Sequence, residues 1–116
     1  MTQSTLKFIK VPKILMEKYG IEIAVFYGYL LDMRMLSENT TFNPDDNRSF
    51  MDNDGIYSVL SYEKITNDTG LSERKIRAYK KKLTELGLMK DNRQLTGGNK
   101  IYVWDIPIWL DYKYGR

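Results

Sequence analysis

The chain has 116 residues, of which 42% are hydrophobic and 28% charged, a composition that fits one globular domain and excludes a disordered tail. It contains no cysteine and no histidine, which excludes disulfides and sulfur-ligated zinc and removes the commonest general base. We therefore expect neither an enzyme nor a cofactor. The net charge is only +3, so charge alone does not identify a partner.

The N-terminal part predicts two helices. A short β-rich run at residues 8–11 leads into Pro12, which favours the first turn of a helix that Gly20 ends. The next helix runs from residue 21 to about residue 37 and is apolar on two faces, which predicts burial in a core, or in a core and an oligomer interface. Its two stripes are Ile21, Ala24, Val25, Gly28 and Leu31, and Phe26, Leu30 and Met33.

A polar stretch at residues 38–48, which contains Pro44, is predicted to be a loop. Residues 49–51 and 56–59 then flank a turn and predict a hairpin, in which Gly55 is able to take a positive φ.

The acidic turn of this hairpin has a second interpretation as a calcium loop. Counting from Asp52, a glutamate does stand at the twelfth position, Glu63, as calcium-binding loops require. The glycine, however, is the fourth residue instead of the sixth, and residues 56–61 have the pattern of a strand and a helix cap. We therefore favour a solvated turn, with Asp45, Asp46, Asp52 and Asp54 as an acidic cluster that binds no metal.

The next segment predicts two helices joined by a tight turn. Ser61 is an N-cap candidate for a short helix at residues 62–69, and Gly70 allows the chain to reverse. Ser72 caps a second helix that extends to Gly87. The residues expected to face the core are Ile65 in the first helix and Ile76, Leu83 and Leu86 in the second.

Two strands, at residues 88–90 and 101–104, are predicted around a turn at residues 96–99. Helix, turn, capped helix and hairpin in this order are typical of a winged helix-turn-helix, so we expect an α+β fold, mainly α, with a C-terminal β-hairpin wing. We expect one domain over residues 1–116, with its core at about 6–104 and an aromatic-rich segment at 105–116.

The second of these helices is also strongly basic. Residues 72–87 contain six Lys and Arg residues against two Glu residues, whereas the whole chain carries only +3. An exposed basic face on an ordinary amphipathic helix is the plain alternative. The charge coincides, however, with the turn, both caps and the hairpin, so we favour binding of this helix in the major groove of double-stranded DNA.

Individual side chains of the two helices and the hairpin have predicted roles in DNA binding. Arg74 and Arg77 are expected to contact bases, because a guanidinium pairs bidentately with guanine. Lys75, Lys80, Lys81 and Lys82 are expected to contact phosphates, although Lys80 stands where such helices often bury a leucine, a place that Tyr79 is able to take. The full predicted DNA-binding set is Ser61, Tyr62, Ser72, Glu73, Arg74, Lys75, Arg77, Ala78, Lys81, Lys82, Arg93 and Lys100; Ser61 and Tyr62 are assigned to a phosphate, and Arg93 and Lys100 to the wing at the minor groove.

Several segments together form a more specific pattern. They are Phe8-Ile9-Lys10-Val11-Pro12-Lys13, Tyr27-Gly28-Tyr29-Leu30-Leu31-Asp32-Met33 with Leu36-Ser37, Asp52-Asn53-Asp54-Gly55-Ile56-Tyr57, Ser61-Tyr62-Glu63-Lys64-Ile65, and Gly70-Leu71-Ser72 through Leu83-Thr84-Glu85-Leu86-Gly87-Leu88. Over residues 6–104 the chain resembles the N-terminal domain of the plasmid replication initiator A family. The resemblance implies a winged helix that dimerises through its N-terminal elements and binds short origin repeats through the basic helix.

Such initiators have a further C-terminal domain that engages host replication proteins, whereas this chain stops at Arg116. We expect either an excised domain or a short relative of plasmid or phage origin. Replication initiation and transcriptional regulation use the same fold and are not separated by the sequence.

A protein-docking winged helix, acting as a replication adaptor or inhibitor, is a further alternative. The apolar helix and the aromatic residues Trp109, Tyr112 and Tyr114 motivate it, but a core helix with a tail packed over the core or a dimer seam is favoured.

The sequence predicts neither a membrane span nor a signal peptide. The longest uncharged apolar stretch is residues 23–31, whereas a helix that crosses a membrane needs about 20 such residues. We expect a cytoplasmic protein without membrane contact, whose partners are double-stranded DNA, a second copy of the chain and host replication proteins.

Overall fold

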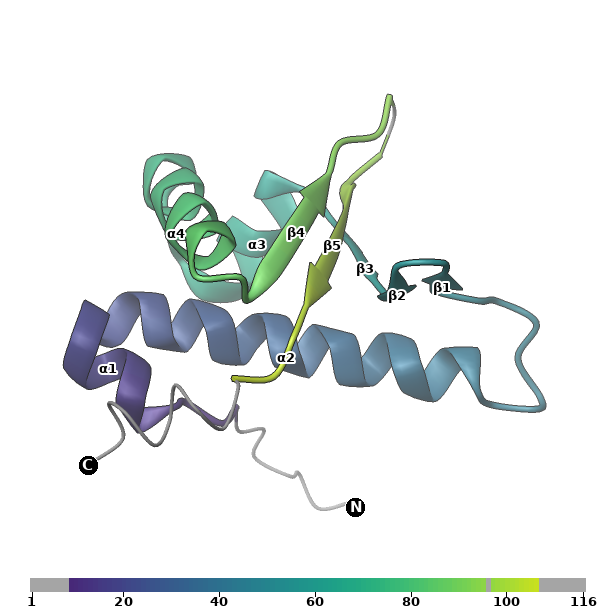
Figure 1. The fold of residues 1–116 in the computed structure, drawn as a ribbon. Helices are drawn as coiled ribbons and strands as arrows, with labels where there is room; N and C mark the ends of the chain where they lie inside the picture. The colour runs from purple at the N-terminus through teal and green to yellow at the C-terminus, as the bar shows by residue number, and fades with distance from the viewer. Residues whose placement is uncertain (1–8, 96, 107–116) are drawn as a thin grey trace, which may run out of the picture.

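The computed structural model describes residues 9–95 and 97–106. Its elements are α1 (Lys13–Tyr19), α2 (Ile21–Thr41), β1 (Met51–Asp52), β2 (Gly55–Ile56), β3 (Ser58–Leu60), α3 (Tyr62–Thr69), α4 (Glu73–Glu85), β4 (Met89–Asn92) and β5 (Asn99–Val103). In Figure 1, α2 runs along the base of the fold, with α3, α4 and the β4–β5 hairpin above it and α1 folded back below one end.

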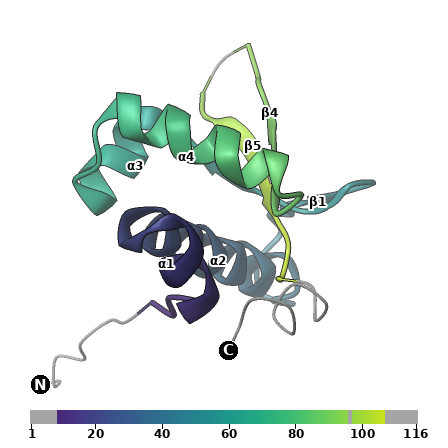
Figure 2. The same ribbon diagram turned by 60° about the vertical axis from the view of Figure 1, so that its left-hand side comes forward.

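The main sheet has the antiparallel strand order β3-β5-β4, so the strand that precedes α3 pairs with the wing hairpin. Figure 2 shows α4 lying across α3 and followed directly by β4. This is the winged helix-turn-helix that the sequence predicts. Both wing strands are displaced from the predicted ranges, beginning at Met89 and Asn99, and α4 ends at Glu85, two residues before Gly87.

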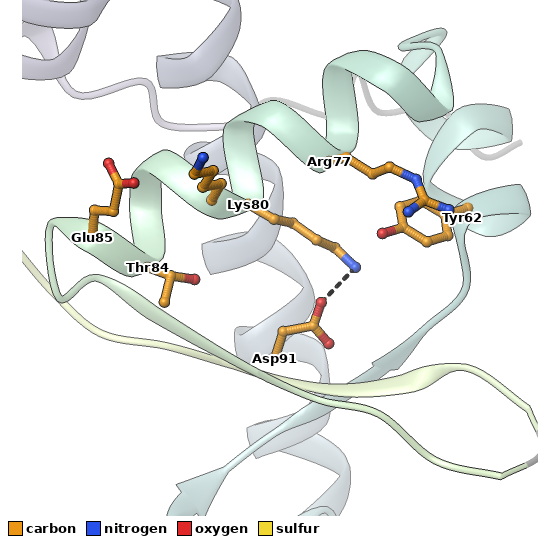
Figure 3. A pocket seen from close by; sticks show the side chains of 7 residues that line it. Tyr62, Arg77, Lys80, Thr84, Glu85 and Asp91 are labelled. Atoms are coloured by element: carbon orange, nitrogen blue, oxygen red, sulfur yellow. Dashed lines mark ion pairs between the residues drawn. The ribbon is translucent and has the colours of Figure 1, made fainter.

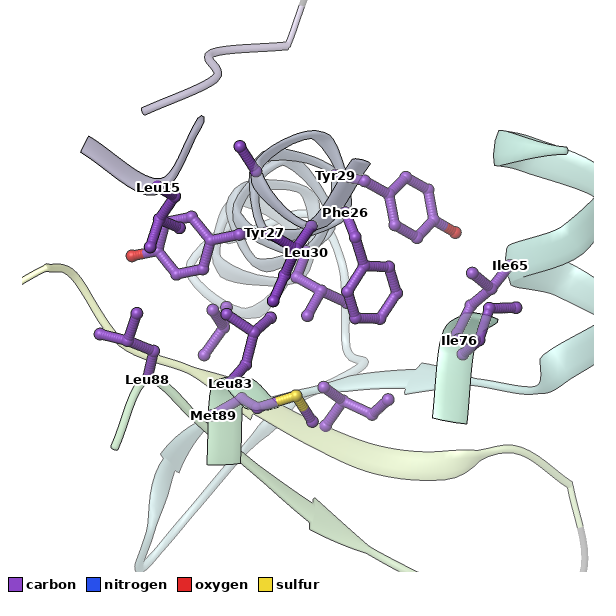
Figure 4. Close-up of a cluster of buried hydrophobic side chains, with 14 of the residues drawn as sticks. Leu15, Phe26, Tyr27, Tyr29, Leu30, Ile65, Ile76, Leu83, Leu88 and Met89 are labelled. Atoms are coloured by element: carbon purple, nitrogen blue, oxygen red, sulfur yellow. The ribbon is translucent and has the colours of Figure 1, made fainter. Parts of the chain in front are cut away.

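The core forms around the N-terminal half of α2. Five consecutive residues, from Phe26 to Leu30, are buried, because α1 and the segment before it cover one side of the helix and α4 and the sheet cover the other. Figure 4 shows Tyr27 beside Leu15 of α1, while Leu30 lies toward Leu83 of α4. The predicted burial of α2 on two faces is thus confirmed for this half of the helix.

The C-terminal half of α2 differs from the prediction. The helix continues to Thr41 instead of ending near residue 37, since no glycine or proline interrupts it before Pro44. Met35 and Leu36 are more than half exposed. Ile21, predicted to be in the buried stripe, is 64% exposed because it is the first residue after the turn at Gly20.

The predicted β run before Pro12 is wrong for the described residues 9–11, which form no strand. Their backbone instead crosses α2 at Gly28. A Cβ atom on Gly28 would lie 2.3 Å from the backbone oxygen of Lys10, so this crossing requires a residue without a side chain.

The predicted acidic hairpin is confirmed as β1 and β2, with Gly55 at φ 116°. The Tyr102 hydroxyl donates to Asp52 Oδ2 at 2.6 Å, and Lys90 Nζ lies 2.9 Å from Asp54 Oδ2. Burial and the bond to Asp52 raise the pKa of Tyr102 to about 12. The hairpin therefore docks its carboxylates onto the outer face of the wing sheet; within residues 9–95 and 97–106, no cluster of carboxylates has a metal-binding arrangement.

None of the helices in the described part of the chain is long and apolar enough to cross a membrane. The aromatic segment with Trp109, Tyr112 and Tyr114 lies outside the described residues.

We predict that Gly28→Ala destabilises the fold, although alanine normally favours a helix by about 1 kcal/mol over glycine. The added methyl group displaces the backbone at Lys10, and such overpacking typically costs about 1–3 kcal/mol. Urea unfolding followed by circular dichroism measures the change. Asn39→Ala, at an exposed position of α2, is the control and should shift the midpoint little; a Gly28→Ala protein as stable as the wild type would contradict the close crossing.

Candidate nucleic-acid interface

Two capped helices position the candidate surface. The Ser61 hydroxyl accepts from the Lys64 amide at 3.0 Å, and the Ser72 hydroxyl accepts from the Lys75 amide at 3.3 Å. Gly70 ends α3 with φ +80°, which lets α4 start three residues later in a new direction. The caps and the turn predicted from the sequence are all confirmed.

The rotation of α4 about its axis is also as predicted. Ile76 and Leu83 are fully buried, whereas Leu86 is only half-buried because it caps the end of the helix. The exposed residues of the opposite face are Glu73, Arg74, Arg77, Ala78 and Lys81. This face is therefore available to a partner along about 20 Å of helix.

The basic residues of this exposed face differ in their contacts. Arg77 Nε donates to Glu73 Oε2 at 2.9 Å, and the guanidinium carbon lies 5.1 Å from the centre of the Tyr62 ring. The bond to Glu73 raises the pKa of Arg77 further above its usual value. Among the described residues, Arg74 and Lys81 form no hydrogen bond or ion pair, so both keep their full capacity to bind an anion.

Two other lysines of α4 lie on the flank toward α1 and α2. Lys75 Nζ lies 3.0 Å from Glu22 Oε2, and Glu22 also accepts from the Tyr79 hydroxyl, which raises the pKa of Tyr79 to about 12. Lys82 Nζ lies 3.6 Å from Glu85 and 5.5 Å from the centre of the Tyr19 ring. These lysines are exposed, but they face acidic and aromatic neighbours within the fold.

The phosphate contact predicted for Lys80 is not supported, because Lys80 does not belong to the exposed face. Its side chain is only 7% exposed and its ammonium lies 2.9 Å from Asp91 Oδ2 on β4 and 4.4 Å from the centre of the Tyr62 ring. Asn99 of β5 donates to the other oxygen of Asp91 at 2.9 Å. Figure 3 shows the ion pair bridging α4 and the wing. Tyr79, the alternative for core packing, does contact the core, with its ring 6.2 Å from Phe26.

An open hollow of about 380 Å³ lies beside this ion pair. Arg77 and Lys81 supply its exposed cations, and the Tyr62 ring from the start of α3 forms one wall (Figure 3). Asp91 was not assigned a role from the sequence. Its position two residues after the buried Met89 was the available signal, since alternate residues of a strand share a face.

The wing separates the two residues assigned to it. Arg93 is exposed one residue after the end of β4. Continued alternation from Met89 and Asp91 places it on the side that faces α4. Lys100 points to the opposite face, where its ammonium lies 4.5 Å from the centre of the Tyr57 ring and 3.4 Å from Asp52. Lys100 therefore does not share a surface with Arg93 and α4, contrary to the expected pairing at the wing tip.

We predict that Asp91→Ala destabilises the protein by about 2 kcal/mol, because it leaves the buried Lys80 ammonium without its counter-ion. The double variant Lys80→Met/Asp91→Leu should recover most of this loss, since apolar residues often replace a buried ion pair without cost. Thermal unfolding of both variants and the wild type is the measurement. A double variant less stable than Asp91→Ala would show that the pair itself, and not the unpaired cation, determines stability.

Comparisons with known proteins agree with this fold. The family model described as the N-terminus of replication initiator protein A matches residues 7–114. A solved structure described as the N-terminal domain of a DNA-binding protein has a TM-score of 0.68 at 23% identity, covering 97% of this chain and 92% of that one. A search among curated proteins gave no match.

Two further solved structures are similar over 92% of this chain. One is described as a Rep–DNA complex, with a TM-score of 0.64 at 25% identity and 83% of its own chain covered. The other is described as an MDR initiator, with a TM-score of 0.67 at 20% identity and 85% of its chain covered. At these identities the likeness is one of fold.

Proposed function

The chain belongs to the family of replication initiator protein A N-termini, and on this basis we propose that it binds double-stranded DNA as the DNA-reading domain of a plasmid or phage replication initiator. The observation that carries the proposal is the exposed face of α4, on which Arg74 and Lys81 have no partner within the described residues. A similar solved structure described as a Rep–DNA complex supports it.

In this proposal α4 lies in the major groove. Arg74, near the N-terminus of the helix, contacts a base edge, and Lys81, two turns later, contacts a phosphate. Arg77 reads a second base after its guanidinium leaves Glu73 and the Tyr62 ring. Ser61 and Tyr62 bind a backbone phosphate at the start of α3, beside the hollow.

The remaining predicted contacts keep supporting roles. Lys75 and Lys82 add positive potential on the flank of α4, where Glu22 and Glu85 partly neutralise them. Ser72, Glu73 and Ala78 lie along the groove-facing side of the helix. Arg93 reaches the adjacent minor groove from the wing.

Family membership favours replication over transcriptional control. We propose that the protein acts in the cytoplasm without catalytic chemistry of its own, binds short repeats at a replication origin, and brings host replication proteins to that origin. The described chain is proposed to form one domain.

We predict that Arg74→Ala/Lys81→Ala weakens DNA binding about 10- to 100-fold, because it removes a base contact and a phosphate contact. Fluorescence anisotropy with random-sequence duplex DNA, repeated over a salt series, measures both affinity and its salt dependence. The slope of log K against log salt is negative, and its magnitude should decrease by about 0.9 for each lost phosphate contact. The wild-type protein then serves to select the preferred site from a random pool.

The matched control is Lys13→Ala/Arg48→Ala, which removes the same charge from exposed positions on α1 and in the loop after α2. It should leave affinity within about twofold of the wild type if α4 is the contact and not net charge. Equal losses in the two variants would contradict the proposed surface, and a wild type that binds no duplex at low salt would contradict DNA binding altogether.

We also propose that the protein binds its repeats as a dimer through the C-terminal half of α2. Met35 and Leu36 are 54% and 55% exposed there, and Leu31 and Met35 line an open groove of about 370 Å³. Apolar side chains in this arrangement are typical of an interface between copies. The groove lies on the part of α2 that the wing and α4 leave uncovered.

Sedimentation velocity tests the dimer. At micromolar concentration we expect the mass of two chains, and Met35→Asp/Leu36→Asp should give a monomer that retains its helical circular dichroism spectrum, because charges oppose burial at the interface. Leu95→Ser removes a more exposed leucine elsewhere in the fold and should leave the dimer intact. A monomeric wild type would rule out the dimer without affecting the DNA-binding proposal.

A further inference from the structure

One apolar side chain of the described residues is fully exposed. Leu95, near the tip of the β4–β5 wing, has a relative exposure of 104%, whereas the other exposed large hydrophobic side chains of the described chain lie between 39% and 64%. Burial of a leucine is worth about 1.5–3 kcal/mol, so a fully solvated leucine at a loop tip contributes nothing to the stability of the free domain.

The loop beneath Leu95 is held firmly. The Gln94 side-chain amide donates to the Gly98 backbone oxygen at 2.7 Å and so bridges the loop. Gly98 packs directly on β3 and the start of α3: a Cβ at this position would lie 2.6–2.9 Å from backbone atoms of Leu60 and Ser61. The base of the loop is thus fixed against the helix-turn-helix unit, while Leu95 projects from it.

Leu95 lies on the same side of the fold as the candidate surface on α4. Figures 1 and 2 both show the end of the wing projecting away from α2, on the side of the fold that carries α4. Arg93, two residues before Leu95, is exposed and has no partner within the described residues. The tip therefore presents a guanidinium and an apolar side chain two residues apart, on the side of the fold that carries α4.

We propose that Leu95 is a wedge that enters the minor groove next to the site occupied by α4 and partly opens one base step, with Arg93 binding the walls of the groove. This inference rests on the DNA binding proposed above. Apolar side chains inserted in this way unstack a base step and bend the duplex toward the major groove. The cost of opening is lowest at pyrimidine–purine steps such as TA, so the wedge confers a sequence preference without a hydrogen bond to any base.

The test uses a 30-base-pair duplex enriched from a random pool by the wild-type protein, with the wing position located by hydroxyl-radical footprinting. Two versions carry either a TA step or a stiff A-tract at that position. Anisotropy gives the affinity for each duplex, and energy transfer between dyes on the duplex ends reports bending. Leu95→Ala is compared with the wild type and with Ile21→Ala, an exposed aliphatic residue at the start of α2.

The wild type and Ile21→Ala should favour the TA duplex about tenfold and bring its ends closer together. Leu95→Ala should keep its affinity for the A-tract duplex, lose the preference to within about twofold, and leave the TA duplex nearly straight. Unchanged preference and bending in Leu95→Ala would overturn the wedge, as would a wild type that binds both duplexes equally. A Leu95→Ala protein that instead loses the dimer would assign the tip to contact between copies. Failure of the wild type to bind either duplex would refute the proposed function itself.

Discussion

The packing of α4 against the N-terminal half of α2 is the constraint on which the rest of the structure depends. Ile76 and Leu83 enter a core formed by Phe26 and Leu30, and this burial sets the rotation of α4 about its axis. Once that rotation is fixed, Arg74 and Lys81 face outward, because they lie on the side of the helix opposite to Ile76 and Leu83. The exposed basic face is therefore a product of the apolar core beneath it.

Ion pairs then divide the cations of the fold into two groups. Glu22, Asp52, Asp54 and Asp91 bind lysines on the flank of α4, on the outer face of the wing and at the junction between them. The acidic hairpin in particular covers the side of the sheet that faces away from α4. Among the described residues, Arg74 and Lys81 on α4, Arg93 at the wing and Lys10 are left without an ion pair. Two of these four cations lie on one helix face, which explains how a chain of net charge +3 presents a local basic surface.

Local signals allowed most of the fold to be predicted. Ser61, Gly70 and Ser72 act through bonds and backbone angles within a few residues, so their roles were visible in the sequence and are confirmed. Lys80 and Lys100 depend instead on partners in other elements, Asp91 and Asp52. A one-residue difference in strand position decides which face of the sheet Asp91 and Lys100 take. The predicted roles of both lysines as surface contacts could not be checked without tertiary structure. The exposed tip at Leu95 carried no sequence signal, because a leucine between two strands is equally compatible with a packed turn.

The end of β5 is tied to α2 at three points. The Tyr27 hydroxyl donates to the backbone oxygen of Trp104. The Arg34 guanidinium donates to the backbone oxygen of Val103 at 2.9 Å and to the Asp105 carboxylate at 2.8 Å. The chain is thereby led from the wing down to the base of the fold, away from α4 (Figure 1). The described chain therefore ends beside α2, so a dye attached to a residue near Ile106 leaves the basic face of α4 turned to solution.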